Sequence, residues 1–279
     1  MPLSIQQRLV LRGFAAGALA GLLAFAFGRV MAEPLIQRAI DYADGRSAAE
    51  NALRRAAGLA ATAPDPELFS RAFQRNVGLG VAMLLSGAAI GGLFAVAYVL
   101  VTRIMRPGVR PRTIALSIAG AGFAGVFLLP FLKYPASPPG VGHPDTIHAR
   151  GLLYLAMLAI SVASVVATVV AARRCGSWNG GLLAALGLAI WLAIVMTLMP
   201  GHAETPEPLR NSSGTLVYPG FPADVLYQFR LYAVIAQVIL WGTLGLVFGA
   251  LVERLVPQAD RRAALRSRAK GDVNVLTPQ

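Results

Sequence analysis

All three histidines of the chain fall in hydrophilic segments between long apolar runs. An aspartate lies between the first two, in "GHPDTIHAR". A glutamate follows the third, in "GHAE", and another glutamate follows the first apolar run. Imidazole together with carboxylate suits borderline divalent metals such as cobalt, nickel or zinc, whereas calcium and magnesium prefer oxygen ligands alone. The candidate metal ligands are His143, Asp145, His148, His202, Glu33 and Glu204.

A structural role for the same segment is also open. Asp145 precedes "TIHARG", which begins an apolar run, so its side chain could be the N-cap of a helix and accept hydrogen bonds from free backbone amides. His143 and His148 are five residues apart and therefore do not share a helix face as an i, i+4 metal-binding pair would. The spacing alone does not decide between a metal ligand and a cap.

The elements that must position these residues are membrane spans. The 279 residues are 56% apolar and only 14% charged, where a soluble domain carries about 25% charged residues. The uncharged stretches approach or exceed the roughly 20 residues that a helix needs to cross a bilayer, and they lack the alternation of strands. We predict an all-α, polytopic integral membrane domain over residues 1–257, with transmembrane helices at 9–31, 77–101, 114–132, 151–172, 180–199 and 231–252.

Basic residues indicate how the chain is oriented. The net charge is +12, and two short turns, "TRIMRPGVRPR" and "RRCGSW", hold six arginines and no acid. The positive-inside rule therefore predicts that both termini lie in the cytoplasm. The basic tail, residues 258–279, is expected to be unstructured and to contact lipid headgroups rather than nucleic acid. The lone cysteine, Cys175, excludes a disulfide framework.

The segment between the first two spans, residues 33–75, is the largest hydrophilic piece. Its apolar residues recur at helical spacing opposite charged ones, which predicts one or two amphipathic helices on the extracytoplasmic surface. Gly45 and the pair Pro64/Pro66 are expected to interrupt them.

Charged residues are confined to the ends of the spans. Arg29, Lys133, Arg150 and Arg230 mark the outer ends, and we expect them to pair with acids, Arg29 with Glu33 and Arg230 with Asp224. At mid-membrane depth, polarity is expected only from four residues, which argues against a proton relay. These four are Gln237, Trp241, Ser86 and Thr243.

Two further patterns restrict the function. Pairs of glycines four residues apart, such as Gly13–Gly17, Gly87–Gly91 and Gly245–Gly249, predict close helix packing. The sequence contains no P-loop, no dinucleotide-binding G-x-G-x-x-G after a strand, no H-E-x-x-H and no G-x-S-x-G. We therefore expect neither an enzyme nor a transporter with its own ATPase.

Three segments of the chain carry a family resemblance. "GALAGLLAFAFGRVMAEPLIQRAI", "KYPASPPGVGHPDTIHAR" and "FPADVLYQFRLYAVIAQVILWGTLGLVFG" resemble, in order and spacing, the signature segments of CbtA, a cobalt transporter subunit family. The resemblance implies roles for Glu33, Pro34, Lys133, Tyr134, Pro135, Pro138, Pro139, Asp145, Thr146, Arg150, Pro222, Asp224, Arg230, Gln237 and Trp241. The chain departs from the family pattern at Ser137, where asparagine is usual, and at His143, where an acid is usual.

The resemblance implies the function as well. It implies uptake of cobalt, or a similar divalent metal, linked to cobalamin supply, with no permanently bound cofactor. It also implies a partner, a small one-helix membrane protein with a histidine-bearing terminus, similar to CbtB. The alternative, from a different class, is a non-transporting membrane scaffold that assembles such a partner.

Overall fold

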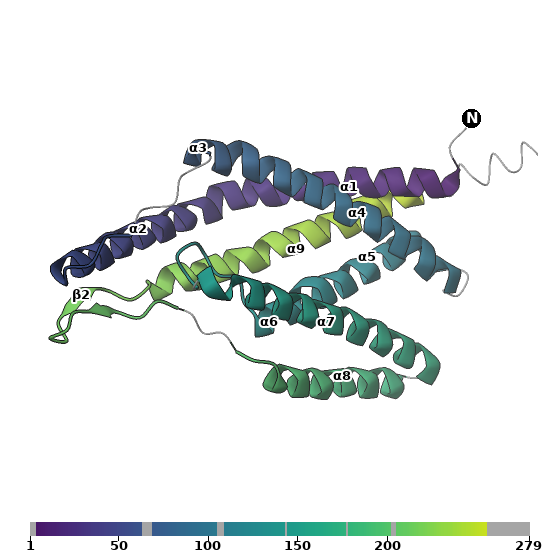
Figure 1. Cartoon of the computed structure of the whole chain (residues 1–279). Helices are drawn as coiled ribbons and strands as arrows, with labels where there is room; N and C mark the ends of the chain where they lie inside the picture. Colours follow the sequence, from purple (N-terminus) through teal and green to yellow (C-terminus); the bar gives the residue numbers. More distant parts are fainter. Residues whose placement is uncertain are drawn as a thin grey trace, which may run out of the picture. The chain divides into compact units, whose positions relative to one another are not determined.

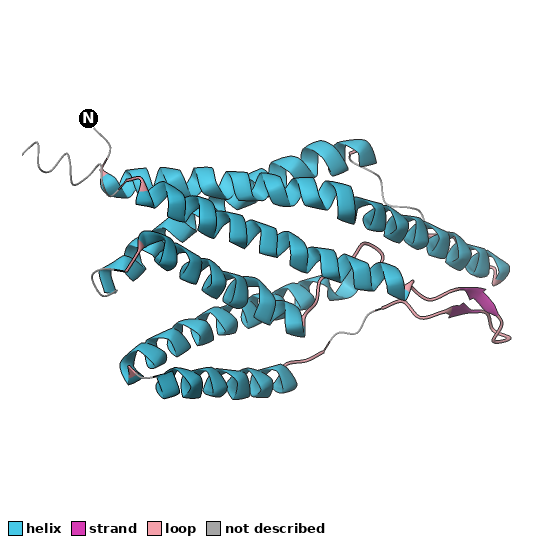
Figure 2. Cartoon of the chain, turned by 180° about the vertical axis from the view of Figure 1, so that it is seen from behind, coloured by secondary structure: helices cyan, strands magenta, loops and turns pink. Residues whose placement is uncertain are grey.

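The computed structural model describes residues 4–62, 69–104, 109–142, 144–176, 178–201 and 205–255. Most of them are helical (Figures 1 and 2). The α helices are α1 (Ile5–Phe27), α2 (Glu33–Ala56), α3 (Arg71–Phe73), α4 (Leu79–Ile104), α5 (Pro111–Gly122), α6 (Leu129–Lys133), α7 (Ile147–Cys175), α8 (Trp178–Leu198) and α9 (Ala223–Glu253).

Within these described ranges, six continuous helical segments are long and apolar enough to cross a membrane. They are Ile5–Ala56, Arg71–Ile104, Pro111–Lys133, Ile147–Cys175, Trp178–Leu198 and Ala223–Glu253. The predicted all-α polytopic fold with six spans is therefore confirmed. The basic tail and the residues His143, His202 and Glu204 lie outside the described residues.

Three π-helical turns join shorter helices into these long segments: η1 (Gly28–Ala32), η2 (Gln74–Gly78) and η3 (Phe123–Leu128). Two of them precede a proline within the helix, Pro34 after η1 and Pro130 after η3. Proline has no N–H for the carbonyl four residues earlier, and a wider turn accommodates the missing hydrogen bond without ending the helix.

The segment after the first span differs from its prediction. It continues α1 through η1 into α2 as one helix to Ala56 instead of starting anew on a surface. Gly45 lies inside α2 and does not interrupt it. The glycine is needed for a close approach instead, since a Cβ at position 45 would overlap the hydroxyl of Tyr218.

The chain forms two compact units, each assembled from separate stretches. The first consists of Met1–Leu23, Ala82–Gly120 and Leu240–Gln279. Its described part contains the close packing of α1 against α4, where Gly17 meets the backbone of Gly87. The fully buried ring of Phe248 packs edge-on against Phe94 and Tyr98, with ring centroids 5.3 and 5.2 Å apart.

The second unit consists of Ala24–Val81 and Ala121–Ile239. It contains α2, α7 and α8, and α7 and α8 run side by side from a short connection (Figure 1). Between α8 and α9 the chain forms a β hairpin that the sequence did not predict, β1 (Leu209–Arg210) with β2 (Leu216–Tyr218) (Figure 2). Two apolar cores lie here, one around Tyr42 and one around Met157.

Candidate functional site

The proline-rich loop, residues 134–142, follows the third span and is fixed at its start by two hydrogen bonds, one to the last turn of α8 and one to a residue just after it. The Lys133 ammonium donates to the carbonyl of Met196 at 2.6 Å, and the Tyr134 hydroxyl donates to the carbonyl of Pro200 at 2.8 Å. The last carbonyls of a helix have no partner within it and carry partial negative charge, so a lysine there is favourable. Burial raises the pKa of the Tyr134 phenol, which therefore stays a hydrogen-bond donor.

The rest of the loop is held by α9, α2 and α7. Arg230 Nε donates to the carbonyl of Ala136 at 3.3 Å, and Pro138 is fully buried while Pro139 is exposed. Gly140 and Gly142 both have positive φ, 77° and 105°, which glycine adopts without steric cost. The loop also passes close to α2 and α7 at these two glycines. A Cβ at Gly140 would lie 2.9 Å from the Cβ of Ala43, and a Cβ at Gly142 would overlap the guanidinium of Arg150.

Tyr42 joins α2 to the segment that leads into α9. Its hydroxyl donates to the carbonyl of Pro219 at 2.9 Å, and its ring packs edge-on against Phe221 with centroids 4.9 Å apart. The Tyr218 hydroxyl in turn donates to the carbonyl of Tyr42 at 3.3 Å. The buried core here comprises Leu35, Ala39, Tyr42, Phe221 and Val225, with Val141 of the loop packed against it.

The three signature segments therefore meet in one place. The first contributes α2, the second the proline-rich loop and the third the start of α9. The structure places five of the residues that the resemblance singles out where each contacts another part of the chain or is buried within it: Lys133, Tyr134, Pro138, Arg150 and Arg230.

The ion pairs differ from those expected. Asp224 accepts from Arg38 of α2 at 2.8 Å, with both side chains about half exposed, and the expected pairing of Asp224 with Arg230 is wrong. Arg230 instead donates through its Nε to the backbone carbonyl of Ala136.

Glu33 also has a different partner. Its carboxylate is buried, 5% exposed, and accepts from Arg71 at 2.7 Å, while Arg29 Nε donates to the side chain of Asn76 at 2.8 Å. The expected Arg29–Glu33 pair is therefore wrong, because each of the two side chains bonds a residue of the second helical segment, Asn76 and Arg71, instead of the other.

The candidate metal ligands are only partly placed. Among the described ones, Asp145 and His148 are exposed, and Glu33 is engaged by Arg71. In the part of the chain that the structure describes, no three His, Cys, Asp or Glu side chains lie close enough together to hold a metal ion. A complete ligand set would therefore need His143, His202 or Glu204.

The capping role expected for Asp145 is wrong. Residues Pro144–Thr146 form a 3-10 turn, η4, so that α7 begins two residues later and its N-cap is Thr146. The Thr146 side chain makes no capping hydrogen bond. The exposed Asp145 carboxylate therefore does not cap α7.

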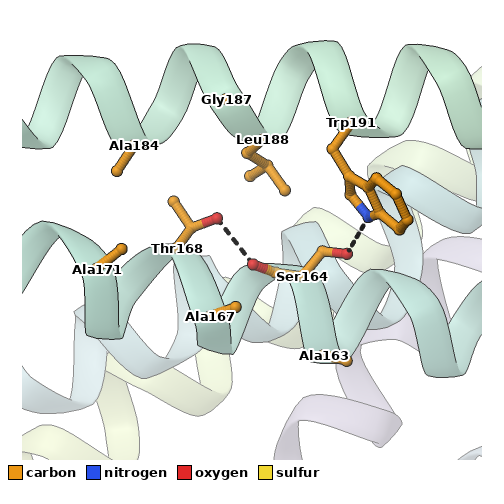
Figure 3. Close-up of a pocket in the computed structure, with 9 residues that line it drawn as sticks. All are labelled: Ala163, Ser164, Ala167, Thr168, Ala171, Ala184, Gly187, Leu188 and Trp191. Atoms are coloured by element: carbon orange, nitrogen blue, oxygen red, sulfur yellow. Dashed lines mark hydrogen bonds between the residues drawn. The ribbon is translucent and has the colours of Figure 1, made fainter.

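The membrane-crossing helices contain polar side chains in addition to the four predicted at mid-membrane depth, Gln237, Trp241, Ser86 and Thr243. In α7 the Ser164 hydroxyl accepts from the Trp191 indole of α8 at 3.0 Å, and Thr168 donates to the Ser164 carbonyl at 2.8 Å (Figure 3). An open cavity of about 460 Å³ lies between these helices, lined by Ala163, Ser164, Ala167, Thr168, Ala171, Ala184, Gly187, Leu188 and Trp191. The sequence did contain a signal for the hydrogen bond between Trp191 and Ser164. Two hydroxyl residues lie four positions apart in one apolar stretch, and a tryptophan lies in the next.

Comparison with known proteins identifies the family. The family described as "Probable cobalt transporter subunit (CbtA)" matches residues 6–253. The chain belongs to the CbtA family. No curated protein and no solved structure matches it.

The family match confirms the resemblance drawn from the three segments, and it covers all six membrane-crossing helices. This CbtA-family chain is accordingly a multi-pass membrane protein. Two of its signature residues lie deeper along α9 than the junction, Gln237 half-buried and Trp241 buried.

Proposed function

We propose that this CbtA-family chain is the membrane subunit of a transporter that takes up cobalt, or a similar divalent transition metal, for cobalamin supply. The family membership carries the proposal, because the match extends over residues 6–253 and leaves out none of the membrane-crossing helices. The junction of α2, the proline-rich loop and α9 supports it, since several residues for which the family resemblance implies roles lie there.

The metal would first meet side chains that water can reach. Asp145 and His148 are exposed, and they stand at the start of α7 next to the proline-rich loop. We propose that they act with His143, His202 and Glu204 as the entry site. Glu33 would join this set only after leaving Arg71, because a carboxylate already paired with a guanidinium has fewer lone pairs to offer a cation.

We further propose a bacterial inner membrane location with both termini in the cytoplasm. The single cysteine tests this orientation directly, because Cys175 is exposed at the end of α7 beside Arg173 and Arg174. A membrane-impermeant maleimide should label Cys175 in inside-out vesicles and leave it unlabelled in intact spheroplasts. The opposite result would reverse the orientation.

The proposed partner is a small one-helix membrane protein with a histidine-bearing terminus. The description of the family as a subunit supports a complex. Co-expression of the tagged chain with such a protein, followed by purification in mild detergent, should recover both in a fixed ratio. Recovery of the chain alone would argue against this partner.

Radiolabelled cobalt uptake is the deciding experiment. Cells that express the chain with its partner should accumulate more ⁵⁷Co²⁺ than cells that express the partner alone. The combined variant His143→Ala, Asp145→Asn, His148→Ala should lose this gain, whereas Arg55→Gln, on the exposed C-terminal part of α2, should keep it. Uptake that is unaffected by the chain would leave only the scaffold function, and normal uptake by the triple variant would reject the entry site.

A further inference from the structure

Three arginines gather where the second helical segment lies against the first. This arginine cluster consists of Arg29 in η1 together with Arg71 in α3 and Arg75 in η2. Two hydrogen bonds join the helices here, from Arg29 to Asn76 at 2.8 Å and from Arg71 to Glu33 at 2.7 Å. All of these residues belong to the second compact unit.

The positive charge of the cluster is only partly balanced. Glu33 is paired with Arg71, and Arg29 is bonded to the neutral amide of Asn76. Three guanidinium groups and one carboxylate leave a net charge of +2. The Nε atoms of Arg71 and Arg75 are also buried without a hydrogen-bond partner. Because these Nε atoms are shielded from the surface, a ligand there would bond to the terminal nitrogens of the guanidinium groups.

The cluster lies at one edge of the apolar membrane-crossing stretches. Arg29 directly follows the uncharged run that ends at Gly28, and Arg75 directly precedes the one that begins at Asn76. Large apolar side chains around them are exposed. Among them Phe69 and Phe73 stack with ring centroids 5.5 Å apart, and Val30 is 70% exposed. Exposed aromatic residues beside cations are typical of the depth of lipid headgroups.

We infer that the arginine cluster binds the phosphate of an anionic phospholipid headgroup. Guanidinium groups present planar donors that match phosphate oxygens, and the net charge favours a headgroup that itself carries net negative charge. The exposed side chains of Val30, Phe69 and Phe73 would contact the acyl chains. A free phosphate could use the same donors but would gain nothing from this apolar surface. The inference does not rest on the proposed cobalt transport, although the cluster includes the partner of Glu33.

Binding to the full-length, delipidated chain in mild detergent tests the inference. Native mass spectrometry would titrate phosphatidylglycerol and phosphatidylcholine, and inorganic phosphate would be added as a competitor. Arg75→Gln should raise the apparent Kd for phosphatidylglycerol roughly fivefold, the effect of about one guanidinium at a membrane surface. Adding Arg29→Gln should raise it further. Arg55→Gln is the matched control, because Arg55 is exposed and donates to the carbonyl of Asn51, one turn earlier in the same helix.

Three results would overturn the inference in distinguishable ways. Equal phosphatidylglycerol affinity in the wild type and in Arg75→Gln would reject the site. Displacement of the lipid by millimolar inorganic phosphate would make a free oxyanion the ligand and reject the headgroup. An equal loss of phosphatidylglycerol affinity in Arg55→Gln would mean that the affinity depends on the net charge of the protein and not on the arginine cluster. Arg71 is left unchanged, because its loss would leave the buried Glu33 without its partner, and Arg75→Gln alone decides if the double variant does not fold.

Discussion

Two helix pairs of this chain contain many small residues, but one pair packs closely and the other leaves a cavity between its helices. In the first compact unit, α1 and α4 approach until glycine backbones touch, since a Cβ on Gly13, Gly17, Gly87 or Gly91 would overlap the facing helix. In the second unit, α7 and α8 leave an open cavity of about 460 Å³ between them, lined by alanines and bridged by the Trp191–Ser164 hydrogen bond.

The difference shows that small residues alone do not determine how closely two helices pack. Glycine removes the Cβ and allows a carbonyl oxygen to approach a Cα, so α1 and α4 gain backbone contacts. In α7 and α8 the alanines retain a methyl group, and the bulky Trp191 is inserted between the helices. The second pair is also less buried, with 17% and 11% of the apolar windows of α7 and α8 buried against 33% for α4.

The largest test of this contrast is a bulky side chain in each contact. Gly17→Leu should prevent α1 and α4 from packing, because even its Cβ would overlap the carbonyl oxygen of Gly87. We expect no folded protein in mild detergent, measured by size-exclusion chromatography and thermal unfolding. Gly187→Leu is the control, since nothing lies within 4 Å of a Cβ built there. Equal damage by both substitutions would remove the distinction.

A single methyl group should give a smaller effect of the same kind. Gly91→Ala places a Cβ against the backbone of Gly13 and 2.8 Å from the Cα of Gly17. We expect a loss of about 1–3 kcal/mol of stability, the usual cost of overpacking. Gly242→Ala in α9 should not destabilise, since its Cβ would meet nothing within 4 Å and alanine favours a helix. Unfolding in increasing sodium dodecyl sulfate measures both, and an unaffected Gly91→Ala would contradict the close approach.

The hydrogen bond across the α7–α8 cavity should matter less than either glycine contact. Trp191→Phe keeps an aromatic ring but removes the donor to Ser164. Hydrogen bonds between membrane helices contribute about 0.6 kcal/mol on average, so we expect a small fall in the unfolding temperature. Trp178→Phe, at a position that is 82% exposed, should cause no change. A loss as large as that of Gly91→Ala would mean that this bond holds the helices together.

The smallest effect is expected at Ser161 of α7. Its hydroxyl is fully buried and has no hydrogen-bond partner, so Ser161→Ala removes a group that costs free energy where it stands. We expect the unfolding temperature to stay equal to that of the wild type or to rise slightly. Ser164→Ala should lower it, because Ser164 donates to the Ile160 carbonyl at 2.6 Å and accepts from Trp191. A marked loss in Ser161→Ala would indicate a partner for its hydroxyl.

The sequence predicted the membrane spans well because their signal is local. A run of about 20 apolar residues can be satisfied only as a helix within lipid, whatever surrounds it. The junction of the three signature segments was predictable only as a list of residues. Nothing in "KYPASPPGVG" indicates that Lys133 and Tyr134 bind the end of α8 or that Arg230 binds Ala136.

The candidate metal ligands mark a similar limit. The residue types and their order in the sequence made these residues candidates. The surroundings of Asp145, His148 and Glu33, however, became known only from the structure. The 3-10 turn at Pro144–Thr146 moved the start of α7 past Asp145. Glu33 bonds Arg71 and Arg29 bonds Asn76, both of the second helical segment, instead of each other.

By itself, then, the amino-acid sequence determined the class of the protein, its six apolar helices and its family, because hydropathy and the order of motifs do not depend on three-dimensional contacts. Only the tertiary structure decided the partners of its charged and small residues. Arg71 rather than Arg29 binds Glu33, and Gly45 leaves room for the Tyr218 hydroxyl instead of forming a turn. The physical reason is that hydrogen bonds and close approaches depend on distances of a few ångströms between residues far apart in the chain, which spacing along the chain cannot specify.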